Sequence, residues 1–164
     1  TPENLRDLVT TLNALAVAYG YPIIVSTHPR TRKRLDTLGV TDIHPLVDFA
    51  KPMGFFDFVK LQMEAKCVIS DSGTITEEST LLNIPAITIR YAHERPEGMD
   101  EGTLIMCGLK TGEVLDAVKV VCEQFAEHGP MRQVADYLAP AVSRKIVRLV
   151  MSYNGYVNRT VWRK

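Results

Sequence analysis

Side chains able to bind an anion are concentrated between Ser70 and Glu97. Asp71-Ser72-Gly73-Thr74 combines hydroxyl groups with a glycine, Glu77-Glu78 follows, and His93-Glu94-Arg95-Pro96 adds cationic groups. Backbone N–H groups at a helix N-terminus and the planar guanidinium of arginine both match a phosphate. The segment therefore predicts a phosphate site, of the kind that holds a nucleotide diphosphate.

The hydroxyl turn at Ser72-Gly73-Thr74 lies between an apolar strand pattern and a helix pattern. Gly73 would let a phosphate approach the backbone closely, and the two hydroxyls would add hydrogen-bond donors. The same residues also suit ordinary helix capping by Ser72 or Thr74. Both interpretations stay open at this level.

Glu77, Glu78 and Arg95 also have both a functional and a purely structural interpretation. Adjacent helical positions diverge by roughly 100 degrees, so we expect only one of Glu77 and Glu78 to face a cleft. A glutamate there would accept hydrogen bonds from a ribose diol, and Arg95 would bind the phosphate. The competing interpretations are solvated carboxylates at a helix start and a solvated arginine on a loop. Arg90 is a second candidate for binding the phosphate, and an ion pair with Glu94 is its alternative.

Two further candidates lie elsewhere in the chain. His28 follows the first apolar strand, where it would donate to a phosphate or a leaving oxygen, or else bond a nearby carbonyl. Gly54-Phe55-Phe56-Asp57-Phe58 holds three of the five phenylalanines. We expect part of this cluster to be core and one ring to stack on a base. The basic run Arg30 to Arg34 indicates a solvated helix face.

Composition narrows the class of protein. The 164 residues carry 19 basic and 19 acidic side chains, so no global field attracts nucleic acid or an anionic membrane. The apolar runs are shorter than the roughly 20 residues of a membrane span. The dispersed cysteines Cys67, Cys107 and Cys122 suit small core residues in a reducing cytoplasm, and no cysteine and histidine cluster indicates a metal site.

Short strands alternate with helices along the chain, which predicts a Rossmann-like α/β domain with a parallel sheet. The strands are expected at Pro22 to Thr27, buried on both faces, and at Ile43 to Val47, Cys67 to Ser70, Ala86 to Ile89 and Thr103 to Cys107. The helices are expected from Thr1 to near Gly20, then at Arg30 to Leu38, Phe55 to Glu64, Ser72 or Thr74 to Leu82, Thr111 to Glu127, Met131 to Tyr137 and Ala141 to Tyr153. Ligands of such sheets bind beyond the carboxyl ends of the strands, where the candidate residues lie.

The combined motifs resemble the non-hydrolysing UDP-N-acetylglucosamine 2-epimerases, which have the two-domain GT-B fold. The resemblance rests on the pattern Ser-x-Ser-Gly-x-x-x-Glu-Glu from Ser70, on Glu94-Arg95-Pro96-Glu97, and on His28. It covers essentially the whole chain, residues 1–164, as one UDP-binding domain, but only the C-terminal half of the family. SDSGTITEES, AHERPEGM and STHPRTRKR are most similar to the branch that forms 6-deoxy UDP-HexNAc sugars, such as UDP-N-acetyl-L-fucosamine, for capsule and O-antigen.

The resemblance implies a role for each candidate residue. The pyrophosphate would lie against Ser72, Gly73, Thr74 and Arg95, the ribose on Glu78 and the uracil near Phe58. His28 would reach the diphosphate, so His28 and Arg95 would stabilise the departing UDP. The implied reaction inverts C2 of a UDP-2-acetamido sugar by elimination and re-addition of UDP, in the cytoplasm, without a metal or other cofactor.

Departures from the family pattern limit what this chain alone should do. Thr74 replaces a second glycine found in many members, and Met53 replaces a glutamine of the better-known branch. A His-Arg pair that the family places before Glu3-Asn4 is absent. The family's proton-transfer carboxylates lie on the N-terminal domain, so the isolated chain is expected to be inactive and to have that domain, and a second copy in a homodimer, as partners.

Two other functions stay open: the donor domain of a GT-B glycosyltransferase that uses a UDP-sugar, and a stand-alone nucleotide-binding module.

The final segment, residues 139–164, is expected to form a terminal helix and tail that pack on the missing domain. Ile146, Val147, Leu149 and Val150 lie at helical spacing there, and Asn154-Gly155 should bend or stop the helix.

Overall fold

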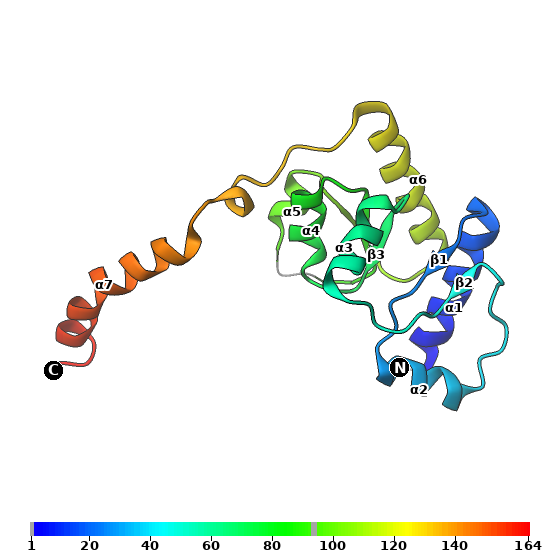
Figure 1. The fold of residues 1–164 in the computed structure, drawn as a ribbon, viewed down its shortest axis with the longest axis horizontal. Coiled ribbons are helices and arrows are strands. Elements are labelled where there is room, and N and C mark those ends of the chain that lie inside the picture. Colours follow the sequence, from blue (N-terminus) through cyan, green and yellow to red (C-terminus); the bar gives the residue numbers. More distant parts are fainter. Residues whose placement is uncertain (1, 93–94) are drawn as a thin grey trace. The chain divides into compact units, whose positions relative to one another are not determined.

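The computed structural model describes residues 2–92 and 95–164, so Thr1, His93 and Glu94, expected at a helix cap and in the basic turn, lie outside the described residues. The chain divides into two compact units, Thr1–Gln133 and Val134–Lys164. The first unit contains the strands and the candidate site. Figure 1 shows its helices.

The strands of the first unit are all parallel, as the sequence predicts. β1 (Ile23–Ile24) pairs with β2 (Val47–Asp48), and β3 (Val68–Ser70) pairs with β4 (Ala86–Thr88), which pairs with β5 (Ile105–Met106). In the described residues these pairings form two sheets, in the orders β1-β2 and β3-β4-β5, rather than the single sheet expected. The α/β class with parallel strands is confirmed.

Only part of the first predicted strand, Pro22 to Thr27, forms a regular strand, namely β1. Its extended backbone continues past β1, because Val25 N–H donates to the Asp48 carbonyl at 2.8 Å and Thr27 N–H to the Ala50 carbonyl at 3.0 Å. The expectation that it is buried on both faces is wrong: Ile24 is 44% exposed. Its neighbours Ile23 and Val25 point to the covered face, as alternation along a strand requires.

Most predicted helices of this unit are confirmed to within a few residues: α1 (Pro2–Tyr19), α2 (Pro29–Leu38), α3 (Phe55–Glu64), α4 (Ile75–Leu82) and α6 (Thr111–His128). Gly39 ends α2 in the left-handed conformation with a φ of 60°, which glycine adopts readily. The four-residue helix α5 (Glu97–Asp100), which starts directly after Pro96, was not expected.

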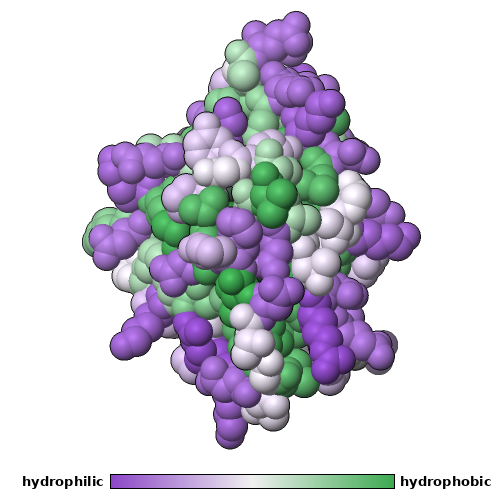
Figure 2. Space-filling model, turned by 90° about the vertical axis from the view of Figure 1, so that its right-hand side faces the viewer, coloured by the Kyte–Doolittle hydropathy of each residue, from purple (hydrophilic) through white to green (hydrophobic). Residues whose placement is uncertain are grey.

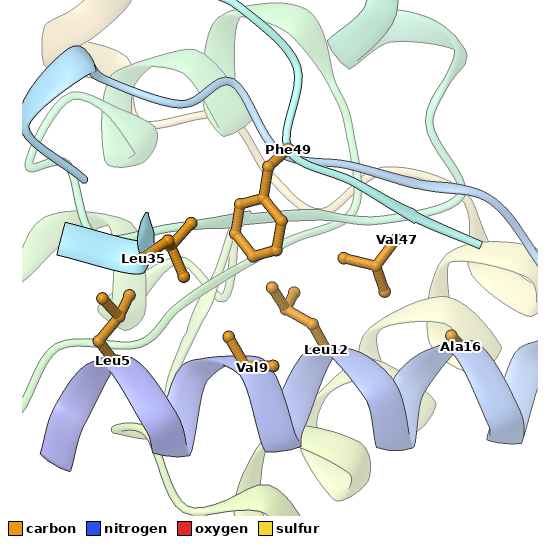
Figure 3. Packing of buried hydrophobic residues seen from close by; sticks show 7 residues of the cluster. All are labelled: Leu5, Val9, Leu12, Ala16, Leu35, Val47 and Phe49. Atoms are coloured by element: carbon orange, nitrogen blue, oxygen red, sulfur yellow. The ribbon is translucent and has the colours of Figure 1, made fainter. Parts of the chain in front are cut away.

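The core forms where helices pack on the two sheets. One cluster brings the buried stripe of α1, Leu5, Val9, Leu12 and Ala16, against Leu35, Val47 and Phe49 (Figure 3). Recurrence at three and four residues places that stripe on one face of the helix. A second cluster packs Val114 and Val118 of α6 on Ile87 of β4, which is completely buried. The two clusters anchor the strand ends from which the candidate site extends.

The second unit differs more from the sequence prediction. The helix expected at Met131 to Tyr137 is wrong: a 3-10 turn covers only Ala135–Leu138. α7 (Val142–Thr160) is longer than expected and continues through Asn154-Gly155, because its i to i+4 bonding does not require a side chain at Gly155. No residue of α7 is buried within the chain.

The surface reflects the balanced charge of the chain. Figure 2 shows hydrophilic residues interspersed with hydrophobic ones on the face that it draws. Among the described residues, no helix is both long enough and apolar enough to cross a membrane.

Candidate functional site

The turn between β3 and α4 is held by its own hydroxyl groups. Ser70 Oγ accepts a hydrogen bond from the Ser72 N–H at 3.0 Å, and Ser72 Oγ accepts one from the Thr74 N–H at 3.3 Å. Thr74 has helical dihedral angles and makes no capping bond through its side chain. Of the two residues considered as caps, Ser72 therefore binds the backbone of the turn, and Thr74 Oγ1 is directed elsewhere.

Two guanidinium groups lie against Gly73. A Cβ atom placed on Gly73 would lie 2.5 Å from Arg95 Nη1 and 3.4 Å from Arg90 Nη1. The space that a side chain would occupy is thus filled by arginine nitrogens, immediately before α4 begins. Guanidinium charge and the positive end of a helix dipole both favour an anion, so this turn is a candidate phosphate position. The sequence placed Gly73 and Arg95 in one site, and the structure brings them together.

Glu77 orients Arg95. The Arg95 Nε–H donates to Glu77 Oε1 at 2.7 Å, and both side chains are about one-third exposed, at 34% and 29%. The other oxygen, Glu77 Oε2, is buried and has no hydrogen-bond partner among residues 2–92 and 95–164. Because Nε is bound to Glu77, the terminal nitrogens of Arg95 are the ones that face Gly73. This answers the question of the acidic pair: Glu77 binds the arginine and does not serve as the open acceptor.

Glu78 belongs to a different set of hydrogen bonds. Thr74 Oγ1 donates to Glu78 Oε1 at 2.7 Å, and Gln62 Nε2 donates to Glu78 Oε2 at 2.6 Å. Ser72 Oγ lies 2.9 Å from Thr74 Oγ1, so the hydroxyls and the carboxylate form one chain. A carboxylate oxygen accepts more than one hydrogen bond, and each oxygen of Glu78 keeps acceptor capacity for a ligand.

Gln62 is a site residue that sequence reasoning missed. It is the only residue of α3 that is buried, with 5% exposure, although its side chain is polar. The signal was present in the sequence, since a glutamine on the apolar side of a helix needs a polar partner. Nothing in the sequence identified Glu78 as that partner.

The phenylalanine cluster lies at the start of α3. Phe55 and Phe56 are 75% and 84% exposed, and their rings meet edge to face with centroids 5.6 Å apart. Phe58 is half-buried. The expectation that part of the cluster is core is wrong, because none of the three rings is buried. Phe58 precedes Gln62 by four residues and so lies on the same face of α3.

His28 caps α2. Its Nδ1 accepts a hydrogen bond from the Arg30 N–H at 3.2 Å, and the imidazole is exposed. A neutral imidazole that accepts at Nδ1 carries its proton on Nε2, which makes Nε2 the donor. The bond to a carbonyl considered from the sequence is therefore replaced by a backbone capping bond. Within the described residues, no hydrogen bond or ion pair links His28 or Phe58 to the cluster around Arg95.

The basic run on α2 takes no part in the cluster around Arg95. Arg30, Lys33 and Arg34 are exposed on α2, which confirms a solvated face, while Arg32 donates to the Phe49 carbonyl. In the described part of the chain, no three histidine, cysteine or acidic side chains gather in a way that could hold a metal ion.

Comparison with known proteins gives consistent results. The profile of the family described as UDP-N-acetylglucosamine 2-epimerase matches residues 1–151. A relative named UDP-N-acetylglucosamine 2-epimerase from Methanococcus maripaludis is 35% identical over 120 residues, which are 71% of this chain and 33% of the relative. The matched part of the chain thus spans about a third of the length of each of the first two curated relatives, so this chain is well short of their full length.

Solved structures agree with this similarity. UDP-N-acetylglucosamine 2-epimerase from Rickettsia bellii is 49% identical, with a TM-score of 0.86 over 99% of this chain and 44% of that protein. The UDP-GlcNAc 2-epimerase of Methanocaldococcus jannaschii, solved in complex with UDP-GlcNAc and UDP, is 27% identical, with a TM-score of 0.82 over 93% of this chain and 41% of its own.

Proposed function

Because this chain belongs to the UDP-N-acetylglucosamine 2-epimerase family, we propose that it is the UDP-binding, C-terminal half of a two-domain enzyme of the GT-B type. The whole enzyme would invert C2 of a UDP-2-acetamido sugar. Membership of this family favours an isomerase over the glycosyltransferase donor domain and over a stand-alone nucleotide-binding module.

One observation carries the proposal: Arg95 and Arg90 converge on the backbone of Gly73 at the start of α4. A glycine faced by two guanidinium groups at a helix N-terminus suits a diphosphate, whose charge the helix dipole also favours. Ser72, Gly73, Thr74 and Arg95 would hold the pyrophosphate.

The nucleoside would extend from the pyrophosphate towards α3. Glu78, fixed by Thr74 and Gln62, would accept hydrogen bonds from the ribose hydroxyls. Phe58 lies one turn before Gln62 on α3, which suits a position near the uracil. The T-shaped pair Phe55 and Phe56 is too exposed to define a pocket within this chain alone.

The proposed roles of Arg95 and His28 depend on the negative charge that develops on the leaving UDP. Removal of the C2 proton and expulsion of UDP give a glycal, and UDP adds back after protonation from the other face. The departing β-phosphate gains negative charge, which Arg95 and the Nε2–H of His28 would stabilise. The family places its proton-transfer groups on the other domain, so the isolated chain would bind UDP without epimerising its sugar.

The finer assignment rests on the motifs of the chain. SDSGTITEES and AHERPEGM support the branch that forms 6-deoxy UDP-HexNAc sugars, such as UDP-N-acetyl-L-fucosamine, for capsule and O-antigen. We place the enzyme in the cytoplasm, as a homodimer. No metal or other cofactor is needed for elimination and re-addition of UDP.

The second unit fits the same proposal. α7 exposes Ile146, Val150 and Tyr153, at 52%, 58% and 54%, along one helical face. Exposed apolar stripes of this kind mark contact surfaces. Residues 139–164 would pack on the N-terminal domain, and the isolated chain should self-associate through them, which sedimentation at increasing concentration would detect.

Calorimetric titration of UDP tests the binding role. Arg95→Ala should lose about tenfold or more in affinity, because a charge-assisted hydrogen bond contributes about 1.5 to 3 kcal/mol. Arg132→Ala is the matched control, since that arginine is 80% exposed and distant in sequence from the site. Equal UDP affinity in both variants would remove Arg95 from the site. A separate assay, C2-proton exchange by the full enzyme, would test the proposed reaction.

A further inference from the structure

The balanced total charge of the chain conceals a division between its two units. Residues 1–133 carry 13 basic and 18 acidic side chains, whereas residues 134–164 carry 6 basic side chains and a single acidic one, Asp136. The net side-chain charge is therefore −5 in the first unit and +5 in the second. Such a concentration of positive charge in a short helical segment is typical of a surface that contacts an anionic partner.

Three arginines of the second unit lie along one face of α7, which is labelled in Figure 1. Arg144 and Arg148 are four residues apart, and Arg159 follows Arg148 by 11 residues, which is close to three helical turns. All three side chains are exposed, and α7 contains no acidic residue. None of the three guanidinium groups forms an ion pair with a described residue. Their charge is therefore uncompensated within the chain.

This basic face lies opposite the apolar stripe that contains Ile146 and Val150. Arg144 and Arg148 each lie two positions from Ile146, and Arg148 lies two positions from Val150. Side chains two positions apart on a helix diverge by about 200 degrees. When the apolar stripe of α7 is covered by protein, as proposed above for the N-terminal domain, the basic face therefore stays in solvent. The two faces can be occupied at the same time.

The basic face is flat, because the residues between its arginines are small. Ser152 and Gly155 lie at helical spacing between Arg148 and Arg159, so the long guanidinium side chains project furthest. The row from Arg144 to Arg159 is about 22 Å long. No aromatic ring of α7 lies on this face, whereas single-stranded nucleic acid is typically bound by stacking on aromatic rings. A flat row of guanidinium groups suits a planar array of phosphates, such as the surface of an anionic bilayer.

The residues that follow α7 have the same character. Trp162 is the only tryptophan of the chain and is 64% exposed, and Arg163 and Lys164 come directly after it. Tryptophan is enriched where a membrane meets water, because its ring has an apolar body and a polar N–H group. This end of the second unit is therefore also suited to the boundary between lipid headgroups and water.

We propose that the basic face of α7, formed by Arg144, Arg148 and Arg159, binds the surface of a bilayer that contains anionic phospholipid. The guanidinium groups contact lipid phosphates, while the apolar stripe stays on protein. Each cationic side chain near such a surface strengthens binding about fivefold, and salt screens the attraction. The contact is peripheral and reversible, so it is compatible with the cytoplasmic placement proposed above.

Co-sedimentation of the 164-residue chain with vesicles tests this surface. The chain should sediment with an equal mixture of phosphatidylglycerol and phosphatidylcholine but not with phosphatidylcholine alone, and about 0.5 M salt should release it. The triple variant Arg144→Glu, Arg148→Glu, Arg159→Glu should bind about 100-fold more weakly or less. Far-ultraviolet circular dichroism should show the same helix content in the variant as in the wild-type chain.

The basic run on α2 provides a matched control. Arg30→Glu, Lys33→Glu, Arg34→Glu changes the total charge by the same amount, at three exposed positions of another helix. Vesicle binding by this control should fall far less than in the α7 variant. Equal losses in the two triple variants, sedimentation with phosphatidylcholine alone, or no sedimentation with either vesicle would overturn the proposal.

Two further measurements separate this surface from other modes of binding. Ile146→Ser with Val150→Ser should leave vesicle binding unchanged, and a loss as large as that of the α7 charge variant would assign the binding to the apolar stripe instead. The fluorescence of Trp162 should shift to shorter wavelength with anionic vesicles and should not respond to a single-stranded RNA. A shift with RNA, or none with vesicles, would contradict the proposed contact.

Discussion

The side-chain amide of Gln62 donates a hydrogen bond of 2.6 Å to the carboxylate of Glu78, and so joins α3 to α4. Gln62 is buried and Glu78 only partly so. The contact fixes one carboxylate oxygen from the core side, while Thr74 fixes the other from the turn. Glu78 is therefore oriented before any ligand arrives, which lowers the entropy cost of binding.

Gln62→Met should weaken UDP binding selectively. The variant keeps the volume of the buried side chain but removes the donor, so Glu78 is held by Thr74 alone. Titration calorimetry should show that UDP affinity falls about tenfold while a 2′,3′-dideoxy analogue of UDP binds as before, because one such bond is worth about 1.5 kcal/mol. Gln124→Met, on the exposed face of α6, is the control. Equal losses for both nucleotides would mean that Gln62 is only structural.

Gly73→Ala should weaken UDP binding without unfolding the chain. The new methyl group would lie 2.5 Å from Arg95 Nη1, so the guanidinium must move away from the turn. We expect a loss of about tenfold in UDP affinity, from displacement of one charge-assisted contact. Gly112→Ala is matched, because a Cβ there meets nothing within 4 Å. Unchanged binding by Gly73→Ala would show that the phosphate lies elsewhere.

His28 combines two roles that substitutions can separate. His28→Ala removes the capping bond to Arg30 and should lower the free energy of unfolding by about 1 kcal/mol. Asparagine is a good N-cap, so His28→Asn should keep most of that stability while it removes the imidazole donor. Urea unfolding measures the first effect and turnover of the full enzyme measures the second. Full activity in His28→Asn would exclude the imidazole from catalysis.

Ile87 should be among the most costly residues to truncate. It is completely buried between β3 and β5 and packs on α6, so Ile87→Ala should lower the free energy of unfolding by about 2 to 5 kcal/mol. Val17→Ala, at a position that is 73% exposed, should change it by less than about 0.5 kcal/mol. Urea titration followed by circular dichroism compares the two variants, and similar midpoints would contradict the tight packing of Ile87 against α6.

The sequence predicted the elements better than their assembly. Helical spacing in α1 and the cap at Gly39 gave correct bounds, because those signals are local. The sequence could not predict that β1 and β2 form a sheet separate from the other strands, because the pairing of distant segments depends on tertiary packing. The prediction of a helix at Met131 to Tyr137 was wrong because a short apolar pattern does not distinguish a helix from an irregular segment.

The sequence predicted part of the arrangement at the candidate site. Gly73, Thr74 and Arg95 were recognised from their types and order. The structure brings Arg95 against Gly73, while the Thr74 hydroxyl binds Glu78. Gln62 was not recognised, because its partner is 16 residues away on another helix. The division of labour between Glu77 and Glu78 depends on which face of α4 each occupies, and the sequence alone leaves that to tertiary contacts.

The separation of the strands into two sheets also determines where the molecule opens first. The ladder β1-β2 has only two strands and depends on its packing against α1, whereas the three-stranded β3-β4-β5 encloses the fully buried Ile87. Backbone amides of β1 and β2 should exchange with solvent deuterium faster than those of β4. On this expectation His28 follows a strand of the pair that opens more readily, and Gly73 follows a strand of the sheet that opens less readily. Small local openings could then move the imidazole while the phosphate turn stays in place.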